Sequence, residues 1–342
     1  MRVTEEVAES RLLARWGELL GRDPGQIGRF NESDAELVPL GDGRLLALTV
    51  DTVDEEVRCG LYREPRTAGR AAAVAALSDL AAVGADPLGL LLSVGLPGRD
   101  RERVQEGVAR GVREVCEATG TFVLGGDTSD AETLTVAGVG AGLVPCESVL
   151  TRVGARPGHV VGVTGRVGSG SALAAASLLG GHPAEAGYGE EDWRPMPRLR
   201  EGRQLRGVAS ACMDTSDGLV AALDQIARLN DVAIRVTWPA ERLLEPGAAG
   251  VQARLGLPAF AFLAGHHGEF ELVFTVPEGR WDGLARAAAR AGWEPLPIGW
   301  VERGVGLFFG SRGIDGARVR NLLSEVGGDP RAYARALVAL AP

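Results

Sequence analysis

A long helix that is apolar on almost every side is the feature that most constrains how this chain can fold. Residues 68–83 read AGRAAAVAALSDLAAV, and a run so rich in alanine and leucine favours helix. A helix without a polar face is buried between other layers of a fold. We therefore expect residues 68–83 to lie between layers, and Asp79 is conspicuous in such surroundings.

Aspartate-bearing segments recur at the ends of apolar stretches. They are Thr49-Val50-Asp51, Ser78-Asp79, Gly125-Gly126-Asp127-Thr128 and Asp214-Thr215-Ser216-Asp217-Gly218. Carboxylates are costly to bring near an apolar core, and hard cations such as Mg²⁺ prefer oxygen ligands. Together the four segments predict a metal site.

Each segment also has a simpler interpretation. Asp214 and Asp217 precede a predicted helix at 219–229 and can cap its start. Residues 125–128 can form a glycine turn after a short strand, and Asp79 can be a buried carboxylate bonded to a neighbouring helix end. Their joint occurrence is what favours a metal site over four separate local roles.

The charge balance excludes several classes of protein. The net charge of −9 disfavours a nucleic-acid or anionic membrane surface, although it is compatible with a small anion bound together with metal. All 36 basic residues are arginine. The chain therefore has no Walker A lysine, no protein-kinase lysine and no Schiff-base lysine.

The cysteines and the apolar segments indicate a protein of the reducing cytoplasm. The four cysteines form no CxxC pair, so neither a zinc framework nor a disulfide scaffold is predicted. No signal-peptide pattern opens the chain, and no run of 18 apolar residues occurs. We expect neither secretion nor membrane insertion.

The chain is long enough for two domains, and its strands and helices alternate twice. The turn-rich stretch 151–158 is the predicted boundary, which gives domains at 1–150 and 151–342. Predicted helices span residues 5–20, 68–83, 101–119, 168–179, 204–211 and 219–229, and predicted strands span 44–50, 90–96, 122–124, 133–144, 160–164, 232–236 and 272–276, with a polar loop at 181–192. This alternation indicates an α/β (α+β) architecture.

Three further motifs are ambiguous by themselves. The glycine-rich loop 165–171 can cradle phosphate through its backbone N–H groups, or can simply start a helix. The pair at 266–267 places two histidines side by side, but adjacent side chains diverge, which disfavours a shared metal. Residues 194–198 (RPMPR) read as a rigid loop whose arginines can meet phosphate.

The order and spacing of these motifs resemble those of thiamine-monophosphate kinases, within the aminoimidazole ribonucleotide synthetase-like (PurM-like) superfamily. The resemblance covers about residues 10–300 and rests on ESDAELV (32–38), LTVDT (48–52), ALSDLAAVGADP (76–87), LGGDTS (124–129), TRVGARPG (151–158), VTGRVGSGSAL (163–173), RPMPR (194–198), MDTSDGL (213–219) and GEFELVFTVP (268–277). It implies an N-terminal domain whose sheet pairs across a homodimer, a C-terminal α/β sandwich, and ATP with several Mg²⁺ between the domains.

The resemblance also assigns roles to residues of this chain. It implies metal ligands at Asp34, Thr49, Asp51, Asp79, Asp127, Asp214 and Asp217, of which Asp214 and Asp217 are the expected catalytic groups, and nucleotide contacts at Gly126, Asp127, Arg152 and Ser216. Direct transfer of the γ-phosphoryl group would then rely on positioning and on metal charge.

The chain departs from the family pattern mostly on the side of the phosphate acceptor. Ser33 replaces the first of two paired acids and leaves only Asp34, and Arg58 stands where the family usually has histidine. Glu269 falls at a substrate-facing position, and residues 313–323 contain no clear match to the family's C-terminal aromatic contact. Arg58 and Glu269 are the predicted acceptor contacts, and Arg58 would suit an anionic acceptor.

Three functions are compatible with these observations. The first is an ATP- and Mg²⁺-dependent phosphotransferase that acts on thiamine monophosphate or another small anionic acceptor. The second is an ATP-dependent ligase or cyclase that activates an amide or carbonyl oxygen. The third is a non-catalytic nucleotide-binding descendant, which the acid missing at Ser33 suggests.

Overall fold

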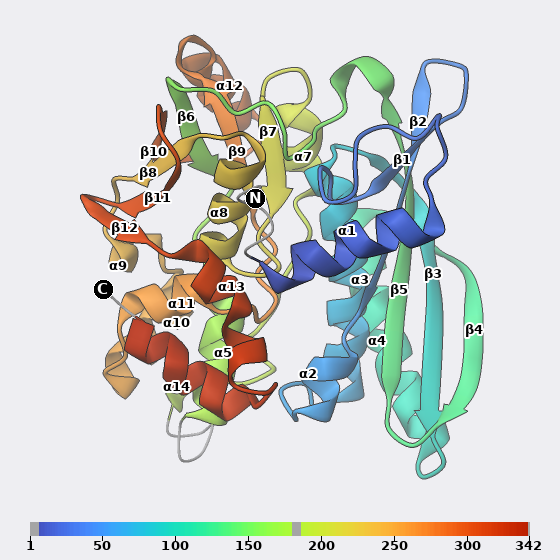
Figure 1. Cartoon of the computed structure of the whole chain (residues 1–342). Coiled ribbons are helices and arrows are strands. Elements are labelled where there is room, and N and C mark those ends of the chain that lie inside the picture. Colours follow the sequence, from blue (N-terminus) through green and yellow to red (C-terminus); the bar gives the residue numbers. More distant parts are fainter. Residues whose placement is uncertain (1–6, 180–185, 341–342) are drawn as a thin grey trace.

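Two sheets organise the computed structural model, which describes residues 7–179 and 186–340 (Figure 1). The N-terminal sheet has the order β1-β2-β5-β3-β4. Its strands are β1 (Glu36–Pro39), β2 (Arg44–Thr52), β3 (Asp86–Pro97), β4 (Val123–Ala131) and β5 (Thr135–Pro145). Only β3 and β4 pair in parallel; the other neighbours are antiparallel.

The predicted apolar helix is α3 (Pro65–Ala82), and 14 of its 18 residues are buried. One side of α3 packs on β5, while α7 (Leu199–Leu205) and β7 (Ala211–Asp214) of the C-terminal part cover another side. This placement confirms that the helix lies between layers. Because it touches both parts of the chain, any group on α3 can take part in a site between them.

Glycines let α3 pack very closely against α4 (Arg101–Thr119). A Cβ atom added at Gly111 would overlap the carbonyl oxygen of Arg66, and one at Gly69 would overlap the carbonyl oxygen of Val108. Gly107, one turn before Gly111, faces Pro65 in the same way. The two helix backbones are therefore in direct contact.

The C-terminal sheet has seven strands in the order β12-β11-β8-β10-β6-β9-β7. Its remaining strands are β6 (His159–Val163), β8 (Ala233–Val236), β9 (Leu272–Pro277), β10 (Leu296–Glu302), β11 (Gly306–Phe309) and β12 (Arg312–Ile314). The helices of this part are α5 (Ser169–Leu178), α7, α8 (Leu219–Leu229), α9 (Ala240–Leu243), α10 (Pro246–Leu255), α11 (Ala259–Ala264), α12 (Glu278–Arg290), α13 (Gly316–Glu325) and α14 (Pro330–Leu340). The predicted domain boundary falls between β5 and β6.

Two helices of the N-terminal part lie outside its sheet and its α3–α4 layer. They are α1 (Ala8–Leu20) and the short α2 (Asp54–Arg58), which directly follows β2. The predicted helix 5–20 is therefore confirmed from Ala8, and residues 5 and 6 lie outside the described part. None of the helices in the described part is both long and apolar enough to cross a bilayer.

Several predicted boundaries are wrong. Asp51 does not follow β2 but lies within it, since the strand continues to Thr52. Residues 125–128 are not a turn: β4 runs through them, and its pairing with β3 outweighs the flexibility of the glycines. The predicted helix 204–211 is also wrong, because α7 ends at Leu205 and β7 begins at Ala211. The first half of the predicted loop 181–192, up to residue 185, lies outside the described residues.

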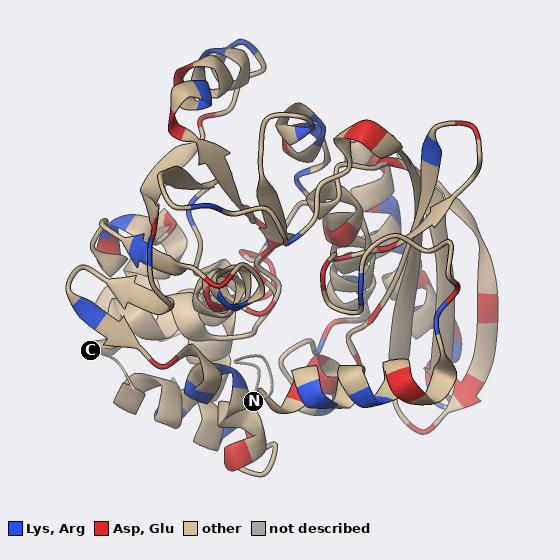
Figure 2. Cartoon of the chain, turned by 45° about the horizontal axis from the view of Figure 1, so that its top comes forward, with Lys and Arg blue, Asp and Glu red and all other residues tan. Residues whose placement is uncertain are grey.

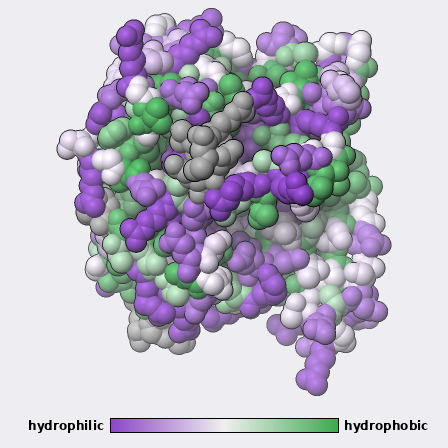
Figure 3. Space-filling model, viewed as in Figure 1, coloured by the Kyte–Doolittle hydropathy of each residue, from purple (hydrophilic) through white to green (hydrophobic). Residues whose placement is uncertain are grey.

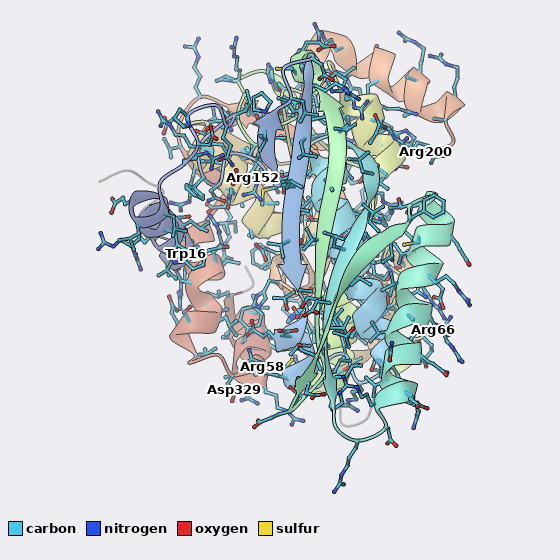
Figure 4. All side chains as sticks on the ribbon, turned by 90° about the vertical axis from the view of Figure 1, so that its right-hand side faces the viewer. Trp16, Arg58, Arg66, Arg152, Arg200 and Asp329 are labelled. Carbon is cyan, nitrogen blue, oxygen red and sulfur yellow. The ribbon has the colours of Figure 1, made fainter. Side chains whose placement is uncertain are left out.

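One face of the N-terminal sheet is apolar and uncovered by the described residues of this chain. Along β5, buried residues alternate with half-buried ones, so one face meets α3 and the other faces outward. Large apolar side chains are exposed on the outward strands and at the edge strand β4, among them Leu48, Val50, Leu91 and Leu124. Figure 4 looks onto this face, and Figure 3 shows green surface at the same side of the molecule.

The close contact of α3 and α4 gives a prediction about stability. Gly111→Ala should lower the free energy of unfolding by about 3 kcal/mol or more, because the new methyl group forces two backbones apart. Gly283→Ala in α12 is the matched control, since nothing lies within 4 Å of its Cβ position. It should stabilise by about 0.5–1 kcal/mol through helix propensity. Urea denaturation measures both, and equal effects would contradict the packing argument.

Candidate functional site

Three of the predicted acidic residues meet between the two parts of the chain. Carboxylate oxygens of Asp34, Asp79 and Asp214 all lie within 4.8 Å of one another. Asp34 precedes β1, Asp79 lies in the last turn of α3, and Asp214 ends β7. Figure 2 shows acidic residues gathered where the two parts face each other. The site thus joins elements that are far apart in the sequence.

Hydroxyl groups hold two of these carboxylates in place. Thr49 on β2 donates its hydroxyl hydrogen bond to Asp79. Ser78 donates to Oδ2 of Asp214 at 2.8 Å, and Ser216 donates to Oδ1 at 2.9 Å. Asp214 therefore has hydrogen bonds from the neighbouring domain's helix and from its own turn.

Asp51 belongs to the same site although it lies on a different strand. Its partner across the sheet is Gly138, which belongs to the buried face of β5, so the Asp51 carboxyl lies on the α3 side. Its Oδ2 atom is buried and has no hydrogen-bond partner. Burial raises the pKa of Asp51, while contact with Asp79 lowers it. An unpartnered buried carboxylate oxygen is suited to bind a cation.

Burial also raises the pKa of the other two acids. The pKa of Asp214 rises to about 8, first through burial and then through repulsion by Asp34, against the hydrogen bonds from Ser78 and Ser216. The pKa of Asp79 is raised well above its usual range by burial and by Asp51. A donor set made only of carboxylate and hydroxyl oxygens fits Mg²⁺, whose charge would remove the cost of ionising these groups.

Arg152 lies against this cluster and binds one of its acids. Its guanidinium donates from NH2 to Oδ1 of Asp34 at 3.0 Å, from Nε to Oδ2 at 3.3 Å, and from NH1 to the side chain of Asn31 at 2.6 Å. Burial opposes the charge of Arg152, but the Asp34 carboxylate outweighs it and raises the guanidinium pKa. Arg152, the predicted nucleotide contact, is thus the counter-ion of Asp34, a predicted metal ligand.

Gly126 and Asp127 do not join the acidic cluster within one chain. On β4, Asp127 pairs with Ser93, which in turn pairs with Ala137 on the outward face of the sheet. The Asp127 side chain therefore lies on the face opposite to Asp51. Since β4 is an edge strand, both residues are exposed there.

The two predicted acceptor contacts also lie apart from the cluster. Arg58 is exposed at the end of α2, and Figure 4 shows it beyond the end of β2, well away from Arg152. Glu269 is buried and accepts hydrogen bonds from the backbone N–H groups of Gly170 at 2.6 Å and Ser171 at 3.3 Å. These are the N–H groups of the glycine-rich loop that could have cradled phosphate. Burial raises the pKa of Glu269 to about 7 against these hydrogen bonds.

Asp217 lies at a cleft of about 360 Å³ beside the acidic cluster. The cleft is lined by Glu9, Glu55, Asp217, Ala221, Ala264, His266, Val319, Arg320, Leu323, Ser324 and Tyr333. Burial lowers the pKa of His266, so its ring is neutral at pH 7. Three acids and one arginine then give the cleft a formal charge of −2.

Sequence reasoning missed the aromatic wall of this cleft. Tyr333 on α14 packs against His266 with ring centroids 4.4 Å apart and the two rings tilted by 53°. Tyr333 lies C-terminal to residues 313–323, the segment that the family pattern would use for its aromatic contact. The apolar periodicity of residues 330–340 would have predicted a helix there, but only the fold brings that helix to the cleft.

The comparisons with known proteins agree with this architecture. Residues 32–144 match the family "AIR synthase related protein, N-terminal domain". The chain is 32% identical over 298 residues to the thiamine-monophosphate kinase of Archaeoglobus fulgidus, covering 85% of this chain and 89% of the relative. It is 35% identical over 275 residues to that of Halobacterium salinarum, covering 79% and 86%.

A solved structure described as "AaThiL complexed with AMPPCP and TMP" superposes with a TM-score of 0.75 at 26% identity, covering 92% of this chain and 97% of its own. The fold and these relatives therefore identify a kinase of the AIR synthase-related class. Within that class, the chain belongs to the thiamine-monophosphate kinase family.

The raised pKa of Asp214 predicts how pH and Mg²⁺ act together on stability. Its folded pKa of about 8 exceeds its ordinary value of 3.8, so its stabilising contribution is complete below about pH 4 and is lost as pH rises through about 8. Without divalent metal, the melting temperature should fall between about pH 6 and about pH 9. Excess Mg²⁺ should raise it more at the higher pH, because the metal binds the ionised carboxylates.

Thermal unfolding followed by circular dichroism, with Mg²⁺ or with EDTA, measures this effect. Asp214→Asn should reduce the pH dependence, and Asp282→Asn, at an exposed position in α12, should behave like the unmodified chain. The same Mg²⁺ effect at both pH values would contradict the assignment.

Proposed function

We propose that this kinase transfers the γ-phosphoryl group of ATP to thiamine monophosphate in a Mg²⁺-dependent reaction that yields thiamine diphosphate and ADP. The main support is the position of the cleft. The acidic cluster, which offers only oxygen ligands, lies beside a cleft that is negatively charged and lined by aromatic rings. The family of the chain and the names of its relatives support the same reaction.

The lining of the cleft suits the ring part of this acceptor. Thiamine carries a permanently cationic aromatic ring, and such rings are favoured by acidic groups and aromatic faces. Glu55 and Asp217 supply the negative charge, and Tyr333 and His266 supply the aromatic surface. Arg58 does not line the cleft, so a purely anionic acceptor has less support than the thiamine ester.

The chain's own carboxylates would hold the metal ions. Asp34, Asp51, Asp79 and Asp214 are the proposed ligands, and bound Mg²⁺ would neutralise the phosphate oxygens of both substrates. Thr49 orients Asp79, and Ser78 orients Asp214. Asp217 lies on the cleft side of the same turn, where it can hold a further metal next to the acceptor phosphate. Catalysis then consists of holding the two phosphates in line.

Arg152 and Ser216 are proposed to meet the nucleotide from the edge of this cluster. Arg152 is bound to Asp34, and Ser216 to Asp214. Both side chains are therefore held within reach of any phosphate that the same metals bind. The proposed roles of Gly126 and Asp127 require a second chain, because both lie on the outward side of the sheet or at its edge.

The outward face supports a homodimer as part of the proposal. A contiguous apolar sheet face of this kind is typical of an interface. A partner's sheet packed there would cover Leu48, Val50, Leu91 and Leu124, which are all exposed in the single chain. It would also bury the surroundings of Asp127.

Activity can be tested by incubating the chain with ATP, Mg²⁺ and thiamine monophosphate and following the products by ³¹P NMR. Thiamine diphosphate and ADP should form. Asp79→Asn should reduce kcat by about 100-fold or more through loss of a metal ligand, while Asp282→Asn should not. ADP with free phosphate and no diphosphate would contradict the kinase reaction and would favour the ligase or cyclase chemistry.

The homodimer can be tested by light scattering coupled to gel filtration. The chain should elute at twice its mass of 35.7 kDa. Leu124→Glu should shift the population to monomers, because it places a charge on the apolar edge. Val305→Glu is the matched control, since Val305 is similarly exposed but lies in the C-terminal part. A wild-type monomer would overturn the proposed interface.

A further inference from the structure

The N-terminal helix α1 bridges the two parts of the chain over the open side of the cleft. Figures 1 and 2 both show one end of α1 at the C-terminal part and the other end beside the N-terminal sheet. Glu9, in its first turn, is one of the residues that line the cleft. The first turn of α1 therefore forms part of the wall of the cleft.

Among the described residues, two polar contacts and the buried Val7 directly before the helix hold the first turn of α1 in place. The backbone N–H of Ala8 donates to Oδ1 of Asn321 on α13 at 2.8 Å, and Glu9 forms an ion pair with Arg320 at 3.4 Å. Further along, the backbone at Gly17 rests on the ring of Phe30. None of the 13 residues of α1 is buried. A helix with so little buried apolar surface belongs to the part of a structure that opens most easily.

Large apolar side chains further along α1 are exposed. Leu12 and Trp16 are 66% and 61% exposed, and Figure 4 shows Trp16 on α1 at the outside of the molecule. Leu19 and Leu20 are exposed as well. The polar contacts of the first turn and the buried Val7 directly before it therefore hold the start of α1.

The two partners in the ion pair differ in their freedom to move. The side chain of Arg320 is 7% exposed and fixed in the wall of the cleft, whereas that of Glu9 is 62% exposed. If α1 lifts, Glu9 leaves with it and the charge of the cleft becomes less negative. If α1 is down, Glu9 adds a carboxylate to the surface that would face a cationic ring.

We propose that α1 is a movable strap across the acceptor cleft, and that Glu9 is a specificity-determining residue that faces the positively charged ring of the acceptor. The role of Glu9 rests on the proposed function, whereas the movement of α1 does not. The Ala8–Asn321 and Glu9–Arg320 contacts hold the strap down. Loss of either contact weakens this hold and removes no residue of the acidic cluster.

Limited trypsin digestion tests the movement, because α1 contains Arg11 and Arg15. Cleavage there removes the first 11 or 15 residues, which intact-mass spectrometry detects. Glu9→Gln and Arg320→Gln should increase the cleavage rate about fivefold by weakening the tether, since cleavage follows the population of the open form. Glu9→Gln should not disturb folding, because the Glu9 side chain is exposed. A change in its cleavage rate therefore reports on the tether of α1.

A matched control accompanies these variants. Arg318→Gln removes an exposed arginine of the same α13. It should not change the cleavage rate. Equal rates in wild type, Glu9→Gln and Arg320→Gln would overturn the strap, whatever reaction the protein catalyses.

Steady-state kinetics test the role of Glu9. With thiamine monophosphate as acceptor, Glu9→Gln should raise the acceptor KM up to about fivefold and leave the KM for ATP unchanged. Thiamine monophosphate together with a non-hydrolysable ATP analogue should slow the cleavage of α1 in the wild type. An unchanged acceptor KM would remove Glu9 from recognition. Failure of the wild type to use thiamine monophosphate would contradict the proposed function and with it this role of Glu9. The digestion of the free protein would still show whether α1 is a movable strap.

Discussion

Mutual repulsion among buried carboxylates is the constraint around which this structure is arranged. Asp51, Asp79 and Asp214 approach one another and Asp34, and burial raises the pKa of Asp51, Asp79 and Asp214. Without compensation such a cluster would push the two parts of the chain apart. One half-buried arginine, several hydroxyl donors and a geometry that suits a divalent cation compensate for this repulsion.

The close packing behind the cluster explains how α3 can carry one of these acids. The helix is fixed on the α4 side by glycine contacts that leave no room for a methyl group, and it is fixed on the sheet side by the glycines of β5. A helix held this firmly keeps Ser78 and Asp79 at constant positions. The rigid packing of α3 against α4 and β5 therefore fixes the position of the Asp79 carboxylate in the site.

Residue patterns were sufficient to predict the features that depend on local periodicity. The buried α3, the helix α8 and most strands of the first half follow from the spacing of apolar residues. The acidic segments alone predict Asp79 and Asp214 in one site, whereas Asp34 is added only by the family resemblance. The failures have tertiary causes. Pairing with β3 made a strand out of Gly125 and Gly126, which by themselves favour a turn.

Side-chain direction was the other quantity that the sequence could not supply. Asp127 has the right residue type and spacing, but the alternation of β4 turns it to the outward face. Tyr333 reaches the cleft only because α14 folds back across α11 and α13. Glu269 is directed into the start of α5, a contact between residues about 100 positions apart in the sequence.

The division of the acidic cluster between both parts of the chain has a mechanical consequence. Asp79 and Thr49 come from the N-terminal part, whereas Asp214 and its turn come from the C-terminal part. A cation shared by these groups would act as a reversible cross-link between the two parts. The stiffness of the molecule would then follow the concentration of free divalent metal around it, and the same ion that prepares the phosphates would also set how freely one part moves against the other.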